Sequence, residues 1–130
     1  MRRETYRLNP PVTNDDLNAL FADSWEHHER TDFSALLRHS LVYVCAYEGS
    51  RLIGFVNVAW DGGIHAFVLD TTVHPDFRRR GIGQGLVRHA AEAARERGSE
   101  WLHVDYEPHL DTFYKSCGFQ HTLAGLMRLQ

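Results

Sequence analysis

The most informative segment of this chain is Val73-His74-Pro75-Asp76-Phe77-Arg78-Arg79-Arg80-Gly81-Ile82-Gly83-Gln84-Gly85-Leu86. Its pattern is a strand end, a turn with proline, a pair of glycines and a helix. A helix start offers unpaired N–H groups, and glycines let the backbone approach a phosphate closely. Three arginines add charge-assisted contacts. The segment therefore predicts a site for a di- or polyphosphate, the alternative being a turn whose glycines only relieve crowding.

Elements of both types surround this segment. Alternating apolar and aromatic residues predict strands, and apolar residues at four-residue spacing predict helices. Strands are expected over residues 5–8, 41–47, 52–60, 64–73 and 101–105, and two short closing strands between 119 and 129. Helices are expected after Thr13 or Asn14, over 33–38, from Ile82 to a stop at Gly98, and over 110–116. The order indicates a mixed α/β (α+β) fold.

Composition narrows the class of protein. With 130 residues, 43% of them hydrophobic, the chain is expected to form one domain over residues 1–130. A net charge of −3 argues against a nucleic-acid-binding face, and no apolar run reaches the about 18 residues of a membrane span. The start does not resemble a secretory signal, and the two cysteines are predicted to be free thiols, so a cytoplasmic protein is expected. The nine histidines show no zinc-type spacing, so no metal is expected.

Two motifs carry a resemblance to a known family. Arg78-x-x-Gly81-x-Gly83, with Val73-His74-Pro75 before it, resembles the acetyl-CoA motif of the GCN5-related N-acetyltransferases (GNAT). Further along, Phe113-Tyr114-Lys115-Ser116-Cys117-Gly118-Phe119 resembles that family's late signature. The resemblance implies a mostly antiparallel sheet with splayed central strands and about four flanking helices. It also implies acetyl transfer from acetyl-CoA to a primary amine, directly and in a ternary complex.

The resemblance further implies which residues bind the cosubstrate. The backbone of Thr71, Thr72 and Val73 would pair with the pantetheine arm and polarise the thioester carbonyl. The pyrophosphate would lie on backbone amides from Arg79 through Arg80, Gly81, Ile82 and Gly83 to Gln84, beside the arginines from Arg78 onward. No metal and no covalent enzyme intermediate are required.

The catalytic residues follow from the same resemblance. Tyr114 matches the tyrosine that protonates the departing sulfur of CoA, and a phenol is still protonated at neutral pH. The sequence departs from the family at the base, because Phe67 stands where many relatives carry glutamate. Asp70 is one candidate for the base. Glu107 is another, since His103, Asp105 and Glu107 alternate onto one face of a strand; the choice stays open.

Three functions compete for this fold. The first is an N-acetyltransferase acting on a small-molecule or protein amine, the second a catalytically silent acyl-CoA-binding or regulatory domain, and the third a nucleotide-phosphate binder. A homodimer is compatible with each of them. The acceptor is predicted to be cationic, because residues 25–30 are rich in charge and the facing strand holds Asp105 and Glu107.

Overall fold

The computed structural model of the chain describes residues 3–130 and contains one five-stranded sheet. Strands follow each other in the sheet in chain order, and every neighbouring pair is antiparallel except the last, β4 with β5. The strands are β1 (Thr5–Leu8), β2 (Ser40–Glu48), β3 (Arg51–Trp60), β4 (His65–Val73) and β5 (Trp101–His103). The helices are α1 (Asn14–Ser24), α2 (Phe33–Leu37), α3 (Ile82–Glu96) and α4 (Asp111–Ser116), with 3-10 turns η1 (Pro75–Phe77) and η2 (Pro108–Leu110).

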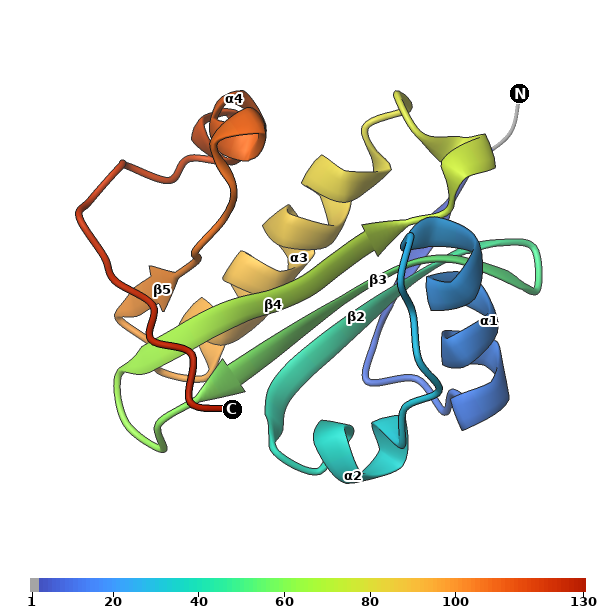
Figure 1. Cartoon of the computed structure of the whole chain (residues 1–130), viewed down its shortest axis with the longest axis horizontal. Helices are drawn as coiled ribbons and strands as arrows, with labels where there is room; N and C mark the ends of the chain where they lie inside the picture. The colour runs from blue at the N-terminus through green and yellow to red at the C-terminus, as the bar shows by residue number, and fades with distance from the viewer. Residues whose placement is uncertain (1–2) are drawn as a thin grey trace.

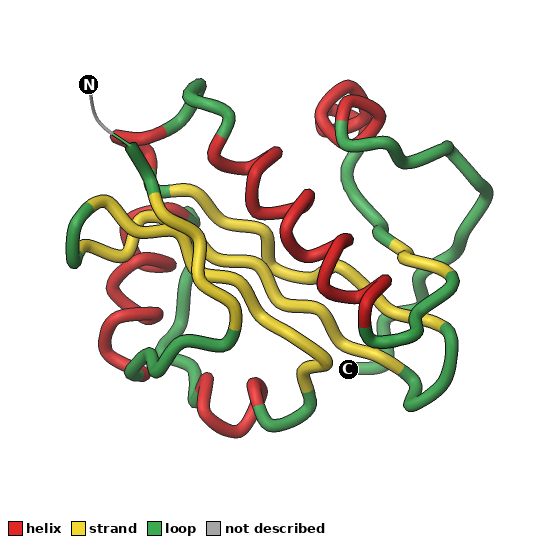
Figure 2. Tube along the Cα trace, turned by 180° about the vertical axis from the view of Figure 1, so that it is seen from behind, coloured by secondary structure: helices red, strands yellow, loops and turns green. Residues whose placement is uncertain are grey.

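The helices cover the two faces of the sheet unequally. The long helix α3 crosses one face diagonally, as Figure 2 shows from behind, while α1 and α2 cover part of the other (Figure 1). Side chains on a strand alternate between faces, so β2 sends Val44 towards α3 and Cys45 towards α1. The mixed order and the sheet predicted from the sequence are confirmed.

Local signals set the helix ends. The Thr13 hydroxyl accepts a hydrogen bond from the Asp16 amide at 3.0 Å, so Thr13 is the N-cap of α1. Gly98 follows the end of α3 with φ of 93°, a conformation that glycine adopts without steric cost. Both positions agree with the sequence prediction.

The end of the chain differs from its prediction. The expected strand over 101–105 stops at His103, and no strand forms between 119 and 130. The prediction of two closing strands is therefore wrong. Because β5 pairs with β4 through only three residues, its free edge offers too few backbone groups to template further strands. The apolar side chains of this last segment stay exposed: Leu123, Leu126, Met127 and Leu129.

Candidate active site

A bulge interrupts the pairing of β4 with β3. Phe55 faces Thr72 and Asn57 faces Leu69, so β4 places one residue more than β3 between these two pairs. The extra residue is at Asp70. Its φ of 59° lies in the left-handed region that residues other than glycine rarely adopt. Bulges of this kind bend a strand and redirect its side chains.

The strands β4 and β5 pair only at the start of β4. Their last paired residues are Phe67 and His103, after which β5 ends while β4 continues to Val73 (Figure 1). The backbone of Thr71, Thr72 and Val73 therefore has no strand partner on this side among the described residues. An unpaired strand edge offers N–H and C=O groups to an extended ligand.

The turn before α3 is open at its amides. Gly81 is the N-cap with φ of 77°, and no side chain caps the helix. The first intrahelical bond runs from the Gly85 amide to the Gly81 carbonyl at 3.0 Å, so the amides of Ile82, Gly83 and Gln84 have no helical partner. Free amides at the positive end of a helix dipole suit a phosphate group.

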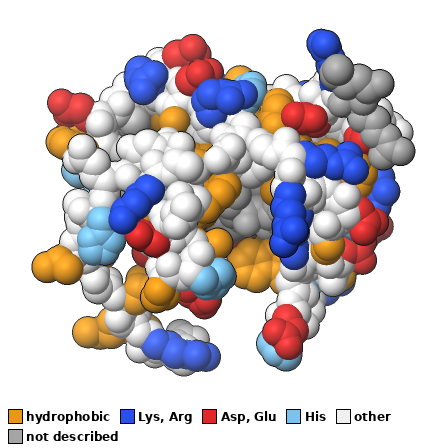
Figure 3. Space-filling model, turned by 90° about the horizontal axis from the view of Figure 1, so that it is seen from above, with side chains coloured by type: hydrophobic (Ala, Val, Ile, Leu, Met, Phe, Trp, Pro, Cys, Tyr) orange, Lys and Arg blue, Asp and Glu red, His pale blue; other side chains and the backbone are white. Residues whose placement is uncertain are grey.

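The three arginines of this turn have different surroundings. Arg78 donates to the carbonyls of Val73 at 3.4 Å and Ser24 at 3.2 Å, and so ties the turn to the end of α1. The Arg80 guanidinium lies 5.0 Å from the centre of the Phe77 ring. Arg79 makes no ion pair or hydrogen bond with any residue of 3–130. In Figure 3 the molecule is hollowed at this end, with Lys and Arg side chains on the rim.

Helix α4 brings Tyr114 to the unpaired part of β4. Tyr114 is buried and stacks on Tyr106, with ring centroids 4.8 Å apart. Its hydroxyl lies 3.4 Å from Oγ1 of Thr71, 43 residues away in the chain. Burial raises the pKa of Tyr114 above its ordinary value, while the hydrogen bond with Thr71 acts in the opposite direction.

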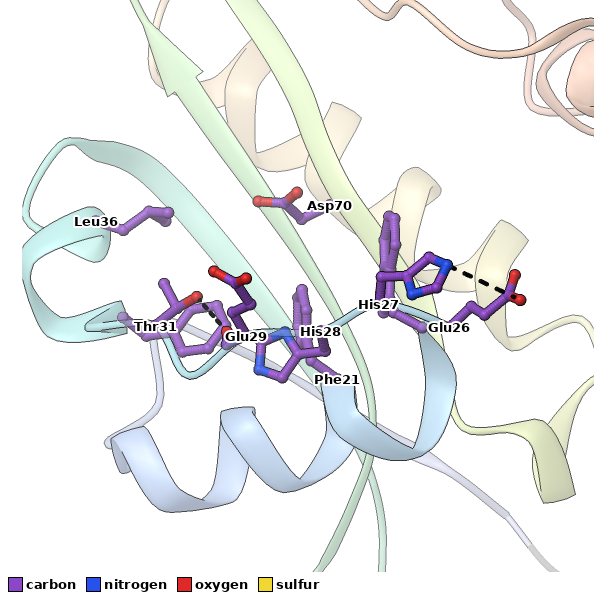
Figure 4. A pocket seen from close by; sticks show the side chains of 10 residues that line it. Phe21, Glu26, His27, His28, Glu29, Thr31, Leu36 and Asp70 are labelled. Carbon is purple, nitrogen blue, oxygen red and sulfur yellow. Dashed lines mark hydrogen bonds and ion pairs between the residues drawn. The ribbon is translucent and has the colours of Figure 1, made fainter. Parts of the chain in front are cut away.

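A cleft of about 720 Å³ opens between β4 and the segment that joins α1 to α2. Asp70 contributes the β4 side, and its carboxylate points into the cleft (Figure 4). Burial raises the pKa of the Asp70 carboxyl above its usual value. Tyr114 does not line this cleft, but its partner Thr71 directly follows Asp70 in the chain. The remaining lining residues are Phe21, Trp25, Glu26, His27, His28, Glu29, Thr31, Phe33 and Leu36.

Comparison with known proteins agrees with this geometry. Residues 10–119 match the model of the acetyltransferase (GNAT) family. This chain belongs to the GNAT family. An uncharacterized N-acetyltransferase of Pyropia yezoensis is 31% identical over 70 residues, which cover 54% of this chain and 40% of that protein. The chain spans half or less of the length of the curated relatives it matches.

Solved structures share the whole GNAT fold. A GNAT-family acetyltransferase from Streptococcus pneumoniae is 25% identical with a TM-score of 0.84, and the match covers 98% of each chain. A GNAT-family N-acetyltransferase from Escherichia coli, solved in complex with CoA, is 20% identical with a TM-score of 0.78. That match covers 92% of this chain and 70% of the other. The second structure is similar in fold.

The residues predicted to share one strand face after α3, His103, Asp105 and Glu107, do not line the cleft of this GNAT domain. Exposure alternates from Trp101 to Glu107, as the predicted one-face pattern requires, although the paired strand ends at His103. The Glu107 side chain is 80% exposed and lies 3.5 Å from His109. His103 hydrogen-bonds with His65 at 2.8 Å. Neither Glu107 nor His103 lines the cleft.

Two functional features have no clear sequence signal. The first is a hydrogen-bond chain in which Trp25 Nε1 donates to Thr72 Oγ1 at 2.9 Å and Thr72 Oγ1 donates to the Asp70 carbonyl at 2.8 Å. The second is Asn18, a buried polar residue of α1 that exchanges two hydrogen bonds with the backbone of Thr31. A buried polar residue of this kind fixes the segment that closes the cleft. In the sequence, the one feature that indicates this contact is a polar residue, Asn18, on the apolar face of the helix.

Gly83 has a packing role besides any role in phosphate binding. A Cβ at this position would lie 3.1 Å from two ring atoms of Phe113, closer than ordinary contact. The glycine therefore lets α3 approach α4, which carries Tyr114. The two sequence motifs, distant in the chain, touch at this point.

Metal and membrane features give two further findings. Among residues 3–130, no group of three or more His, Cys, Asp or Glu side chains is arranged to hold a metal ion. Over the same range, every helix is too short or too polar to cross a bilayer.

Proposed function

We propose that this GNAT domain transfers the acetyl group of acetyl-CoA directly to a primary amine, small-molecule or protein-borne. The observation that carries the proposal is the contact between Tyr114 and Thr71. Through this contact a buried phenol lies beside the unpaired edge of β4, at the residue that follows Asp70 in the chain. A proton donor and a proton acceptor thus flank one short stretch of backbone.

The residues present fit the cosubstrate. The free amides from Arg79 to Gln84 would hold the pyrophosphate, with Arg79 adding charge. Thr71, Thr72 and Val73 would pair with the pantetheine arm, and a backbone N–H of this edge would stabilise negative charge on the thioester oxygen. The fold shared with the Escherichia coli protein solved with CoA supports this placement.

The chain's residues would manage two protons in the transfer. Asp70 accepts the proton that the attacking amine loses, and its raised pKa makes it a better base than an ordinary aspartate. Tyr114 donates a proton to the sulfur as the carbon–sulfur bond breaks and the carbon–nitrogen bond forms. The products are an amide and free CoA thiol, and the protons balance once Asp70 and Tyr114 exchange theirs with water.

Release of CoA thiol across a panel of amines tests this function. Tyr114→Phe should lower kcat by about 10²-fold or more, with little effect on acetyl-CoA binding. Tyr106→Phe is the matched control, since Tyr106 stacks on Tyr114 but directs its hydroxyl to Asp111 at 2.9 Å. Equal rates in the Tyr114→Phe and Tyr106→Phe variants would assign the acid to another group.

A catalytically silent acyl-CoA-binding domain is the second candidate. Phe67 at the usual glutamate position and the exposed Glu107 favour it, because both remove a carboxylate from the expected place for a base. Binding of acetyl-CoA without release of CoA thiol in the presence of any amine would select this function.

We also propose that the protein is cytoplasmic, since Cys45 and Cys117 are both free thiols. Cell fractionation tests that location.

A further inference from the structure

The acceptor cleft has an aromatic wall whose position is fixed. Trp25 is 47% exposed, yet its indole is held by the hydrogen bond to Thr72 and lies parallel to the Phe21 ring, with centroids 5.9 Å apart and 7° between planes. Phe21 in turn packs on Phe33 at 4.9 Å. An exposed indole with its only donor already bonded presents a preformed apolar face. Such a face binds the body of an organic molecule or a cation above the ring.

The cleft is lined by acidic groups, three carboxylates in all, and by no Lys or Arg side chain. Asp70 and Glu29 project into it from opposite sides, whereas Glu26 pairs with His27 at 4.0 Å (Figure 4). Neither the Asp70 nor the Glu29 carboxylate hydrogen-bonds or forms an ion pair with a residue of 3–130. The cleft therefore holds two negative groups that no neighbouring residue of 3–130 compensates.

We propose that the acceptor is a slender dication: a primary amine on an apolar chain that carries a second ammonium group. This inference rests on the proposed acetyl transfer, because it assigns the reacting amine to Asp70. Once that amine has lost its proton to Asp70, Glu29 still faces the cleft, and a second ammonium between Glu29 and the Trp25 ring compensates it. An anionic acceptor meets repulsion from these carboxylates.

Acceptors with the same five-carbon chain isolate the contribution of the second charge to kcat/KM. The test measures kcat/KM for 1,5-diaminopentane, n-pentylamine, 5-amino-1-pentanol and 5-aminopentanoate at low and high salt. The diamine should be preferred about 5- to 30-fold over the uncharged analogues, in the range of one cation–π contact plus one exposed ion pair, and salt should reduce the preference. The anionic acceptor should be poorest. Equal kcat/KM for diamine and pentylamine would overturn the inference.

Two variants test the residues. Glu29→Gln and Trp25→Leu should each raise KM for the diamine several-fold while KM for pentylamine changes less with Glu29→Gln. Glu92→Gln is the matched control, because it removes an exposed carboxylate from α3, on the other face of the sheet. If Glu29→Gln changes the KM for the diamine no more than Glu92→Gln does, Glu29 does not bind the second ammonium group.

Failure of this inference is distinguishable from failure of the proposed function. Calorimetric titration of 1,5-diaminopentane into the CoA-loaded protein requires no turnover. Diamine binding that weakens in Glu29→Gln, without thiol release from any amine, would support the cleft assignment and reject the enzyme. Thiol release with every amine alike would support the enzyme and reject the dication.

Discussion

At the scale of single residues, Asp70 combines two unfavourable conditions. Its backbone has φ of 59°, and burial raises the pKa of its carboxyl. Strain of this kind is found where the surrounding structure imposes it, often beside functional sites. Both conditions lower the stability of the folded protein when Asp70 is ionised, as expected if this residue serves the proposed chemistry.

Asp70→Asn should therefore stabilise the protein while impairing catalysis. A raised pKa in the folded state means that the folded protein binds the proton more tightly than the unfolded chain. The stability that Asp70 contributes is complete below its unfolded pKa of about 3.9 and is lost as pH rises through the higher folded value. Asparagine carries no charge and tolerates this backbone conformation.

Thermal unfolding between pH 3 and pH 8 checks this prediction. The gain in Tm of Asp70→Asn over the native protein should be small at pH 3 and should reach a plateau at neutral pH, with kcat lowered by about 10²-fold. Glu92→Gln is the control, since Glu92 is an exposed carboxylate on α3, on the other face of the sheet. A gain in Tm that is independent of pH would attribute the effect to the backbone alone.

The second residue-scale prediction concerns alkaline pH. Because burial raises the pKa of Tyr114 above its ordinary value of 10.0, the acid should stay protonated beyond pH 10. The rate of acetyl transfer should fall only above that pH, where stability of the fold is monitored in parallel by circular dichroism. A decline in kcat between pH 8 and pH 9 with the fold intact would contradict the assignment of Tyr114.

At the scale of elements, α3 contacts α4, the helix that carries Tyr114, close to the glycine turn. Gly83→Ala would place a methyl group 3.1 Å from the Phe113 ring, which lies next to Tyr114. A loss of acetyl-CoA binding in this variant has two explanations: the methyl group obstructs the phosphate, or it displaces α4.

A double variant separates these explanations. In Gly83→Ala/Phe113→Leu the clash is relieved, so packing should recover while acetyl-CoA affinity stays reduced if the glycine serves the phosphate. Isothermal titration gives the affinity and thermal unfolding the packing. Gly125→Ala, with open space around it, is the neutral control. Full recovery of affinity in the double variant would leave Gly83 with a packing role only.

At the scale of the whole molecule, acetyl-CoA would contact three elements that are distant in the chain. Its groups would lie on β4, on the turn before α3 and beside α4. Binding to the folded state alone stabilises it, by about 2.7 kcal/mol at 100 times the Kd. Acetyl-CoA should therefore raise Tm by several degrees.

The comparison with ATP identifies the cosubstrate. CoA should also raise Tm, whereas ATP at equal concentration should have a smaller effect because it lacks the pantetheine arm that pairs with β4. An equal shift with ATP would favour the nucleotide-phosphate binder.

The homodimer stays a prediction, and light scattering at several protein concentrations tests it.

Sequence patterns alone predicted the order of elements up to residue 116, the glycine turn before α3 and the two family motifs. These depend on local features: the period of apolar residues, the Thr13 cap, and glycines at positions 81, 83 and 98. Such features act over a few residues and need no partner elsewhere in the chain.

The contacts between these parts depend on the tertiary fold. The bulge at Asp70 comes from the register between β3 and β4, and the contacts of Tyr114 with Thr71 and of Trp25 with Thr72 join residues 43 and 47 positions apart. The tail beyond residue 118 was mispredicted because β-pairing depends on an available edge, and β5 offers three paired residues. Register and packing between distant segments are set by the whole fold, so no local pattern encodes them.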